Sequence, residues 1–548
     1  MKLTTVLCLT GLLITATVFS QSGQNEVINL AKSIKTESFF SHLSTISSDA
    51  FEGRETGSKG YALAADYIVK EIEKIGLKPG GVDGTFFQPI NFESRTMNKE
   101  SVTISFSDGS KNLDGEYGKN ITVLPNIKSS NVNRNEELVF VGYGLEIPEL
   151  GINDFQGIDV KGKTVVISIG LPENIDKQKY RKYVNPLERI KILEKKGVSG
   201  LIFYTNLGIF QNLIFSQLNK FFQTPWFDYQ DADLNNPMLG YGSNLLLYSK
   251  KDFIKDIFKF NEISFKETTK AMDKGLFKPF VFKSSLQVKY TATTKNVSCK
   301  NIAAILPGSD PTLSSEYLII EAHLDHMGIG KAIKKDSIYN GAWDNASGSA
   351  TLLSVAETYK QMPEAPKRSI MFLWVTAEEK GLLGSNYFAK KPTVPASKIV
   401  ADMSLDMAGG IFEAKDILPM GYKMSNLSQA VDFAADNLNL KKDTTNSMEN
   451  EYFERSDHFS FISAGIPSLL LFGGMDAVDP KIKGLKTYEK WEKKVYHSPF
   501  DDMNQNFSKE AFLQGIQVNF LISWFIANEM DEVKWKKESM QYKKYIAK

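Results

Sequence analysis

The sequence predicts an α/β domain with a mixed, largely parallel sheet flanked by helices, interrupted by a β-rich insert. Residues 296–530 alternate between continuous apolar runs of strand length and segments with helical spacing, as expected when parallel strands are buried on both faces. Residues 95–290 instead contain short β-like runs that are separated by turn residues. Four of the five histidines lie in the C-terminal half beside acidic residues, so a candidate site is expected there.

Residues 1–20 are predicted to be a signal peptide. A basic residue precedes an apolar run from Leu7 to Phe19, and Ser20 is a small residue where a signal peptidase could cut. We expect the mature chain to start near Gln21 and to be exported, to a bacterial periplasm or out of the cell. The run is too short to favour a transmembrane helix, so no membrane span is expected in the mature chain.

The composition of the chain limits its partners and its means of stabilisation. At 548 residues it is long enough for two or three domains with full cores. A formal charge of +1 gives no sign of a nucleic-acid partner. Cys299 would be the only cysteine of the mature chain, so we expect no internal disulfide and stabilisation by core burial and metal binding.

Residues 26–94 are expected to be the N-terminal part of the domain that carries the site. Residues 26–77 look helical, and Gly76 ends an apolar stripe at helical spacing. The stripe consists of Leu63, Tyr67, Ile68, Ile72 and Ile75. The loop SDAFEGRETGSKG joins two helical stretches, and we interpret it either as an ordinary connection or as a segment that packs on the substrate side.

Residues 95–290 are expected to form the inserted β-rich domain. The strand-like runs are SVTISFSDGS, ELVFVGYGLEI, KTVVISIG and SGLIFYT. One helix is predicted around residues 186–196. Because this region contains no histidine and no residues at catalytic spacing, we interpret it as an inserted module rather than a second active site.

Residues 296–530 are expected to form the domain that carries the site. The predicted strands are YLIIEAHL, SIMFLWV, IVADMSL and PSLLLF, and SATLLSVAETYKQM and FLQGIQVNFLISWFI have helical spacing. Polar motifs follow these strands, at the edge where open α/β sheets bind their ligands. Residues 531–548 are a Lys-rich end that we expect to be a solvated helix or tail.

Five short segments of this domain place His, Asp or Glu at the end of an apolar run or in the turn after it. They are EAHLDH (321–326), GAWDNASG (341–348), TAEEKG (376–381), SLDM (404–407) and VYHSPFDD (495–502). Zinc binds neutral imidazoles and ionised carboxylates, and a hydrolytic site must leave room for water. The set therefore predicts a two-zinc hydrolase site.

Two of these segments contain pairs of candidate residues with different expected roles. His323 and Asp325 would point to opposite sides of a strand end, so we expect His323 to bind metal and Asp325 to accept the proton of its other ring nitrogen. Glu378 and Glu379 are adjacent, which argues against both binding one ion. One of them should bind metal while the other takes a proton from metal-bound water.

Asp344, Asp406 and His497 lie after or near predicted strands, and each also has a simpler interpretation. Asp344 could cap the helix that begins near Ser347, Asp406 could close a turn, and His497 could be a surface residue. All the simpler interpretations would have to hold together in one domain, so we favour the metal site.

As a set, these motifs resemble the co-catalytic dizinc aminopeptidases, a family of zinc metallopeptidases whose relatives include glutamate carboxypeptidase and the transferrin receptor ectodomain. The resemblance extends over nearly all of the mature chain. In the insert, FVGYGLEI and DVKGKTVVISIG look like the protease-associated domain that is often inserted in these enzymes.

The resemblance implies two Zn²⁺ ions per chain and a ligand set. One ion would be held by His323 and Asp406, and the other by Glu379 and His497. Asp344 would bridge the two ions. Three ligand carboxylates and a bridging hydroxide would then balance the charge of the two ions.

The resemblance also implies roles for residues around the ions. Glu378 would be the general base, and Tyr496 is a candidate for stabilising the oxyanion. A cis peptide is expected before Asn345, and His458 is expected to be a supporting or structural residue near the site. Trp343 departs from the acidic residue of many relatives, and its indole could shape a substrate pocket or merely pack.

The leading interpretation is an exported zinc aminopeptidase that hydrolyses N-terminal peptide bonds with a metal-bridging water and Glu378 as general base. Three alternatives stay open: a compact, single-zinc glutaminyl cyclase-like acyltransferase, a carboxypeptidase, and a catalytically inactive receptor-like binding protein. No arginine cluster can be assigned to a substrate carboxylate, which favours an aminopeptidase over a carboxypeptidase. The expected partner is a peptide substrate, and the insert could mediate a homodimer.

Overall fold

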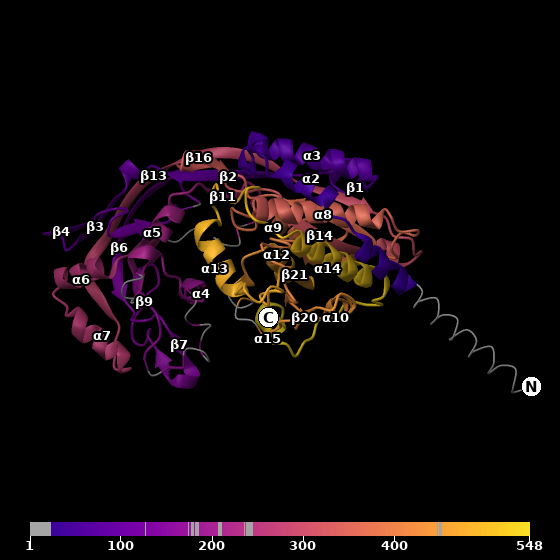
Figure 1. The fold of residues 1–548 in the computed structure, drawn as a ribbon. Coiled ribbons are helices and arrows are strands. Elements are labelled where there is room, and N and C mark those ends of the chain that lie inside the picture. The colour runs from indigo at the N-terminus through magenta and orange to yellow at the C-terminus, as the bar shows by residue number, and fades with distance from the viewer. Residues whose placement is uncertain are drawn as a thin grey trace, which may run out of the picture. The chain divides into compact units, whose positions relative to one another are not determined.

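The computed structural model divides the chain into two compact units (Figure 1). It describes residues 23–547 apart from 127, 174, 177–179, 181–182, 184–185, 206–210, 235, 237–244, 446–447 and 449–451, so the predicted signal peptide lies outside the described residues. The main unit joins Met1–Ile90 to Ser298–Lys548, and the inserted unit is Asn91–Val297. That the inserted unit is a protease-associated domain stays a prediction.

The main unit is built on a mixed sheet with four adjacent parallel strands. Their order is β17, β14, β18, β21, with β13 antiparallel beside β17 and β19 antiparallel beside β21. β1 and β20 complete the two sides. This arrangement confirms the predicted fold class. The strands are β1 Lys78–Pro79, β13 Phe280–Leu306, β14 Tyr317–His323, β17 Ser369–Val375, β18 Ile399–Ser404, β19 Asp416–Met420, β20 Lys441–Lys442 and β21 Ser468–Gly473.

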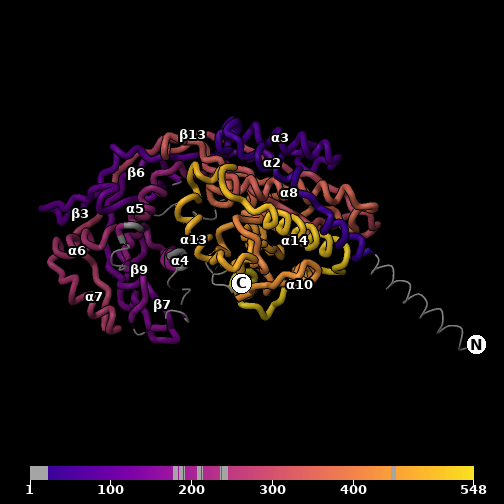
Figure 2. The backbone as a smooth tube through the Cα atoms, viewed as in Figure 1, coloured from indigo at the N-terminus to yellow at the C-terminus, as the bar shows by residue number. Residues whose placement is uncertain are grey.

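Helices cover the sheet on both faces because successive strand residues point to opposite sides. On one face Leu373 of β17 packs with Phe388 of α9 and Phe461 of α12. On the other face Phe372 contacts Tyr359 of α8, whose neighbours are α2, α3 and α14 (Figure 2). The helices of the main unit are α2 Glu37–Ile46, α3 Lys59–Ile75, α8 Ser347–Tyr359, α9 Leu383–Lys390, α10 Ser428–Asn437, α12 His458–Ser463, α13 Gly484–Lys494, α14 Lys509–Asn528 and α15 Met540–Tyr545.

Helix α3 confirms the helix predicted before Gly76, which ends it with a φ of 80°. Leu63, which we expected in the buried stripe, is instead 38% exposed. The helix is rotated so that it buries a neighbouring face, which includes small residues as well as large ones. That face consists of Gly60, Tyr61, Ala64, Ala65, Ile68 and Ile72.

The inserted unit contains its own mixed sheet, in the order β4, β3, β13, β6, β9, β10, β12, β5. Its strands are β2 Phe87–Met97, β3 Thr103–Ser107, β4 Asn112–Gly115, β5 Ile121–Val123, β6 Asn131–Phe140, β9 Thr164–Ile169, β10 Gly200–Thr205, β11 Trp226–Tyr229 and β12 Leu245–Ser249, and its helices are α4 Pro186–Lys195, α5 Gln211–Phe222, α6 Lys251–Phe260 and α7 Phe265–Asp273. The helix predicted around residues 186–196 is confirmed as α4, whereas the expectation of a single helix was wrong because α5, α6 and α7 are also present. In α6 the buried residues Phe253, Ile254, Ile257 and Phe258 recur at helical spacing, which the β-rich interpretation overlooked.

Two further features concern the chain outside the sheets. Among the described residues, no helix has both the length and the apolar character needed to cross a membrane. The Lys-rich end forms α15, and Tyr545 stacks on Phe453 at 5.6 Å between ring centroids. This end is therefore packed on the main unit as well as solvated.

Replacing Leu353 by Ala is expected to lower the free energy of unfolding of the main unit by about 2–5 kcal/mol, because this α8 side chain is fully buried. Leu63→Ala in α3 is the matched control, since an exposed position is expected to change the free energy by less than about 0.5 kcal/mol. Urea denaturation of both variants measures the difference. Equal losses would contradict the placement of α8 in the core.

Candidate metal centre

The five predicted ligands meet at one edge of the main sheet. β14 ends at His323, while Asp406 and Glu379 follow the ends of β18 and β17. Asp344 lies in the turn Ala342–Ala346 before α8, and His497 lies in the loop after α13. Because the strands are parallel, their carboxyl ends share this edge, as in other open α/β sheets.

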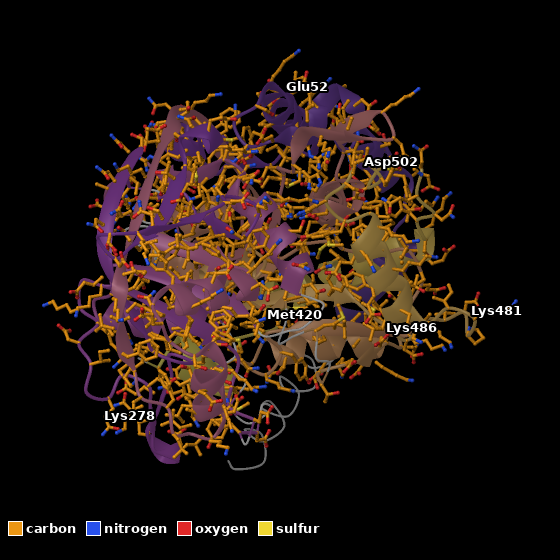
Figure 3. The ribbon with its side chains drawn as sticks, turned by 90° about the vertical axis from the view of Figure 1, so that its left-hand side faces the viewer. Glu52, Lys278, Met420, Lys481, Lys486 and Asp502 are labelled. Atoms are coloured by element: carbon orange, nitrogen blue, oxygen red, sulfur yellow. The ribbon has the colours of Figure 1, made fainter. Side chains whose placement is uncertain are left out.

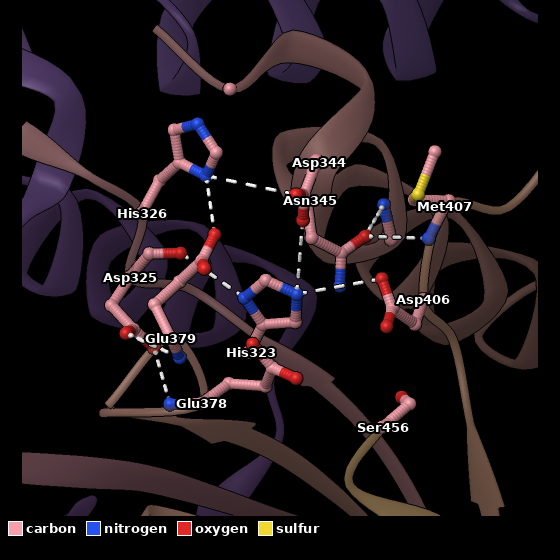
Figure 4. A network of polar contacts seen from close by, with 12 residues as sticks. His323, Asp325, His326, Asp344, Asn345, Glu378, Glu379, Asp406, Met407 and Ser456 are labelled. Atoms are coloured by element: carbon pink, nitrogen blue, oxygen red, sulfur yellow. Dashed lines mark hydrogen bonds and ion pairs between the residues drawn. The ribbon is translucent and has the colours of Figure 1, made fainter. Parts of the chain in front are cut away.

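One group of candidate ligands consists of His323, Asp344 and Asp406, and their ligand atoms all lie within 4.8 Å of one another. His323 Nε2 lies 3.3 Å from Asp344 Oδ1 and 3.4 Å from Asp406 Oδ1 (Figure 4). His323 Nε2 and Asp406 Oδ1 are buried without a hydrogen-bond partner among the described residues. Buried polar atoms without partners are rare in proteins, and a cation between them would satisfy both.

The second group consists of Asp344, Glu379, His497 and His326, again with ligand atoms within 4.8 Å of one another. His497 Nε2 lies 3.1 Å from Asp344 Oδ2 and 3.1 Å from Glu379 Oε2. The two oxygens of Asp344 thus face different groups, so its carboxylate is shared. Imidazole and carboxylate donors in this arrangement fit zinc. Metal binding by these residues stays a prediction.

Sequence reasoning missed His326 as part of the site. The second histidine of EAHLDH is fully buried, and its Nδ1 lies 2.7 Å from Glu379 Oε1. A hydrogen bond donated by Nδ1 would leave Glu379 Oε2 facing His497. Such a contact orients a ligating carboxylate in the way typical of residues around metal ligands. The second histidine was visible in the sequence, but the sequence did not show that its side chain points toward Glu379.

The charges of the site favour a bound cation. Burial would raise the pKa of Asp344, but its close contacts with the imidazoles of His323 and His497 lower it well below its usual value. Burial would lower the pKa of His497, yet Glu379 and Asp344 raise it to about 10. Burial would also lower the pKa of His323, but Glu378, Asp344 and Asp406 together raise it well above its usual value. Carboxylates therefore dominate the potential in the cluster, which is the condition under which a divalent cation binds.

Glu378 differs electrically from its neighbour Glu379. Burial raises the pKa of Glu378 well above the usual value for a glutamate. Burial would also raise the pKa of Glu379, but His497 and the hydrogen bond with His326 lower it. One glutamate is thus suited to carry a proton and the other to bind as an anion, which is the division of roles that the adjacent pair suggested.

Asp325 is in the site but does not make the contact that we expected. His323 Nδ1 lies 3.1 Å from the main-chain oxygen of Asp325 rather than from its carboxylate. The carboxylate instead accepts hydrogen bonds from the main-chain N–H groups of Glu378 and Glu379, at 3.1 and 3.4 Å, and from the Thr56 hydroxyl at 3.1 Å. Asp325 therefore positions the TAEEKG turn, while a carbonyl orients His323.

Asn345 ties the turn of Asp344 to the loop of Asp406. The bond between Asp344 and Asn345 is cis, as the resemblance implied. The Asn345 amide donates to Leu405 O at 2.9 Å and accepts from Met407 N at 3.1 Å, so it contacts the residues on both sides of Asp406 (Figure 4). This side chain fixes the separation of two candidate ligands.

Asp501 and Arg54 hold the remaining loops. Asp501, from the same segment as His497, accepts from the main-chain N–H groups of Trp343 at 2.9 Å and Asp344 at 3.0 Å. The buried Arg54 guanidinium donates to four main-chain oxygens at 2.6–3.0 Å. These oxygens belong to Ile46, Leu324, Asn340 and Gly341. Through Arg54, the loop SDAFEGRETGSKG thus holds the main chain of the segments that carry candidate ligands.

Three further predicted residues are near the centre. Tyr496 stacks on His497 with ring centroids 3.8 Å apart, and burial, together with Asp344 and Glu379, raises its pKa well above the usual value, so its hydroxyl stays protonated. His458 is fully buried outside both ligand groups, and burial lowers its pKa to about 3. The Trp343 indole packs on Trp491 at 4.5 Å and donates to Met407 O at 3.0 Å.

Comparison with known proteins identifies the family. Residues 301–519 match the model of peptidase family M28. The chain is 29% identical to leupeptin-inactivating enzyme 1 of Streptomyces exfoliatus over 234 residues, which are 42% of this chain and 48% of that protein. It is 28% identical to aminopeptidase Y of Saccharomyces cerevisiae over 260 residues, or 45% of this chain and 42% of that protein. The chain therefore matches about half the length of these curated relatives.

A solved structure supports the fold. The aminopeptidase from Aneurinibacillus sp. strain AM-1 superposes with a TM-score of 0.54 at 20% sequence identity, covering 91% of this chain and 95% of that one. At this identity the likeness extends to the fold alone. The region that resembles a known family is thus residues 301–519, which match peptidase family M28.

Proposed function

We propose that this protein is a zinc-dependent aminopeptidase that hydrolyses the N-terminal bond of a peptide. The observation that carries the proposal is the Asp344 carboxylate, whose two oxygens face two separate groups of imidazole and carboxylate ligands. The family match and the likeness to proteins named aminopeptidases support it.

Two Zn²⁺ ions per chain would be held by the two groups. His323 and Asp406 would hold one ion and Glu379 and His497 the other, with Asp344 shared. Zinc in such a site polarises a scissile carbonyl and makes water easier to deprotonate at neutral pH. A single-zinc cyclase would need only one of the two ligand groups. Because both groups have all their predicted ligands close together, the structure favours the peptidase.

The side chains around the ions would carry out the proton transfers. A carboxylate oxygen of Glu378 would take a proton from the attacking water and deliver it to the leaving amine, a task for which its raised pKa is suited. The protonated hydroxyl of Tyr496 would donate a hydrogen bond to the developing charge on the carbonyl oxygen. The Asp325 carboxylate would keep Glu378 in place by accepting a hydrogen bond from the main-chain N–H of Glu378.

We also propose that the protein is exported to a periplasm or out of the cell. The apolar run from Leu7 to Phe19 and the small residue Ser20 support this proposal.

The zinc-loaded protein is expected to cleave peptides with a free N-terminus and to leave their N-acetylated forms intact, because an aminopeptidase must bind the terminal amine. Mass spectrometry of both peptide sets after incubation measures this requirement. Sequential loss of C-terminal residues from the acetylated peptides would contradict the proposal and indicate a carboxypeptidase.

Glu378→Gln is expected to lower kcat by about 10²–10⁴-fold, because the variant cannot accept a proton. Zinc content should stay at two ions per chain, measured by elemental analysis, since Glu378 belongs to neither ligand group. Glu364→Gln, at an exposed position, is the control and should keep full activity. Activity of Glu378→Gln equal to that of the wild type would rule out its role as base.

His326→Ala is expected to weaken binding of one of the two zinc ions by about 10- to 100-fold, because Glu379 loses the contact that orients it. His326→Asn keeps a donor group and should lose less. Competition with a coloured chelator measures both affinities. His42→Gln, which removes a histidine outside both ligand groups, should bind zinc as the wild type does; an equal loss there would show that the effect is not local.

A further inference from the structure

A pocket opens beside the candidate metal centre, and both Asp406 and Tyr496 line it. All its described lining residues belong to the main unit. Much of its wall is apolar, formed by Met407, Met420, Leu470 and Phe472. A group in this pocket would therefore lie next to a bond held at the metals.

Arg455 is the basic residue of the pocket lining. Its guanidinium lies over the Tyr452 ring, 4.8 Å from the centroid. Among the residues that the structure describes, no carboxylate lies within 4.0 Å of this guanidinium. A planar cation with several donors and no anionic partner is suited to bind a carboxylate through paired hydrogen bonds.

Besides Asp406, the described pocket lining contains one other acidic residue, Glu492. Its Oε1 already accepts a hydrogen bond from the Tyr452 hydroxyl at 2.6 Å. The Glu492 carboxylate is thus already engaged, whereas the Arg455 guanidinium has no anionic partner among the described residues. A carboxylate entering the pocket could accept from Arg455, whereas a basic group would be repelled by it.

We propose that Arg455 recognises a carboxylate of the peptide substrate, an inference that rests on the proposed function. The carboxylate is either the side chain of an N-terminal glutamate, whose methylene groups would pack on Met407 and Phe472, or the C-terminal carboxylate of a very short peptide. Both sources present the same planar anion to the same donors. Arg455 thereby sets substrate selection beside the metal centre without being part of the metal site.

The test compares two pairs of peptides, and the members of each pair differ only in whether one carboxylate is replaced by an amide. The wild type should have a higher kcat/KM for Glu-Ala-Ala-amide than for Gln-Ala-Ala-amide, or for Leu-Ala than for Leu-Ala-amide, and the pair that differs identifies the source of the carboxylate. Arg455→Gln should reduce that preference by about 10- to 100-fold, as expected for a lost hydrogen bond to a charged group. Arg455→Lys should retain part of it because the charge remains.

Controls separate this inference from the proposed function. Leu-Ala-Ala-amide should be cleaved equally by the wild type and by Arg455→Gln, and failure of every peptide would count against the aminopeptidase itself. In that case, calorimetric binding of glutamate against glutamine, and of Leu-Ala against Leu-Ala-amide, tests Arg455 directly. Lys486→Gln removes an exposed cation (labelled in Figure 3) that does not line the pocket, and should change no preference. Preferences unchanged in Arg455→Gln would overturn the inference.

Discussion

The shared carboxylate of Asp344 is the interaction on which the rest of the centre depends. One oxygen faces His323 and the other faces His497, so two ligand groups that come from distant parts of the chain are joined at one residue. A buried carboxylate is stable as an anion only when positive charge surrounds it, and here the imidazoles provide that charge. The carboxylates of the cluster together make its potential negative, which would attract divalent cations.

Around Asp344, polar side chains of one loop hold the backbone of another. Asp325 holds the turn of the two glutamates, Asn345 holds the residues on both sides of Asp406, and Asp501 holds the turn of Asp344 itself. Each of these contacts satisfies main-chain groups that would otherwise be buried without partners. The geometry of the candidate ligands is therefore fixed by the fold and does not have to be created by a metal.

The sequence was most informative where a side chain follows directly from a strand. The apolar runs that became β14, β17, β18 and β21 were recognisable because strands buried on both faces have a simple pattern. His326, Asn345 and Asp501 act through turns whose path the pattern does not encode, and for the same reason the carboxylate of Asp325 was assigned the wrong partner. Helices α5, α6 and α7 of the inserted unit were overlooked because short amphipathic segments among strands have an ambiguous period.

Arg54 makes the unit that carries the candidate metal centre discontinuous along the sequence. The arginine precedes the inserted unit, whereas Leu324, Asn340 and Gly341, whose oxygens it binds, follow it. A fragment restricted to residues 301–519 would leave the oxygens of Leu324 and Asn340 without this donor, at a cost of about 1–3 kcal/mol for each buried group, whereas Gly341 O would still accept from the Ala346 N–H. A fragment with boundaries taken from the family match alone would thus lose the side chain that holds the loops of the candidate centre. Replacement of the inserted unit by another domain would instead keep Arg54 and its partners within one unit.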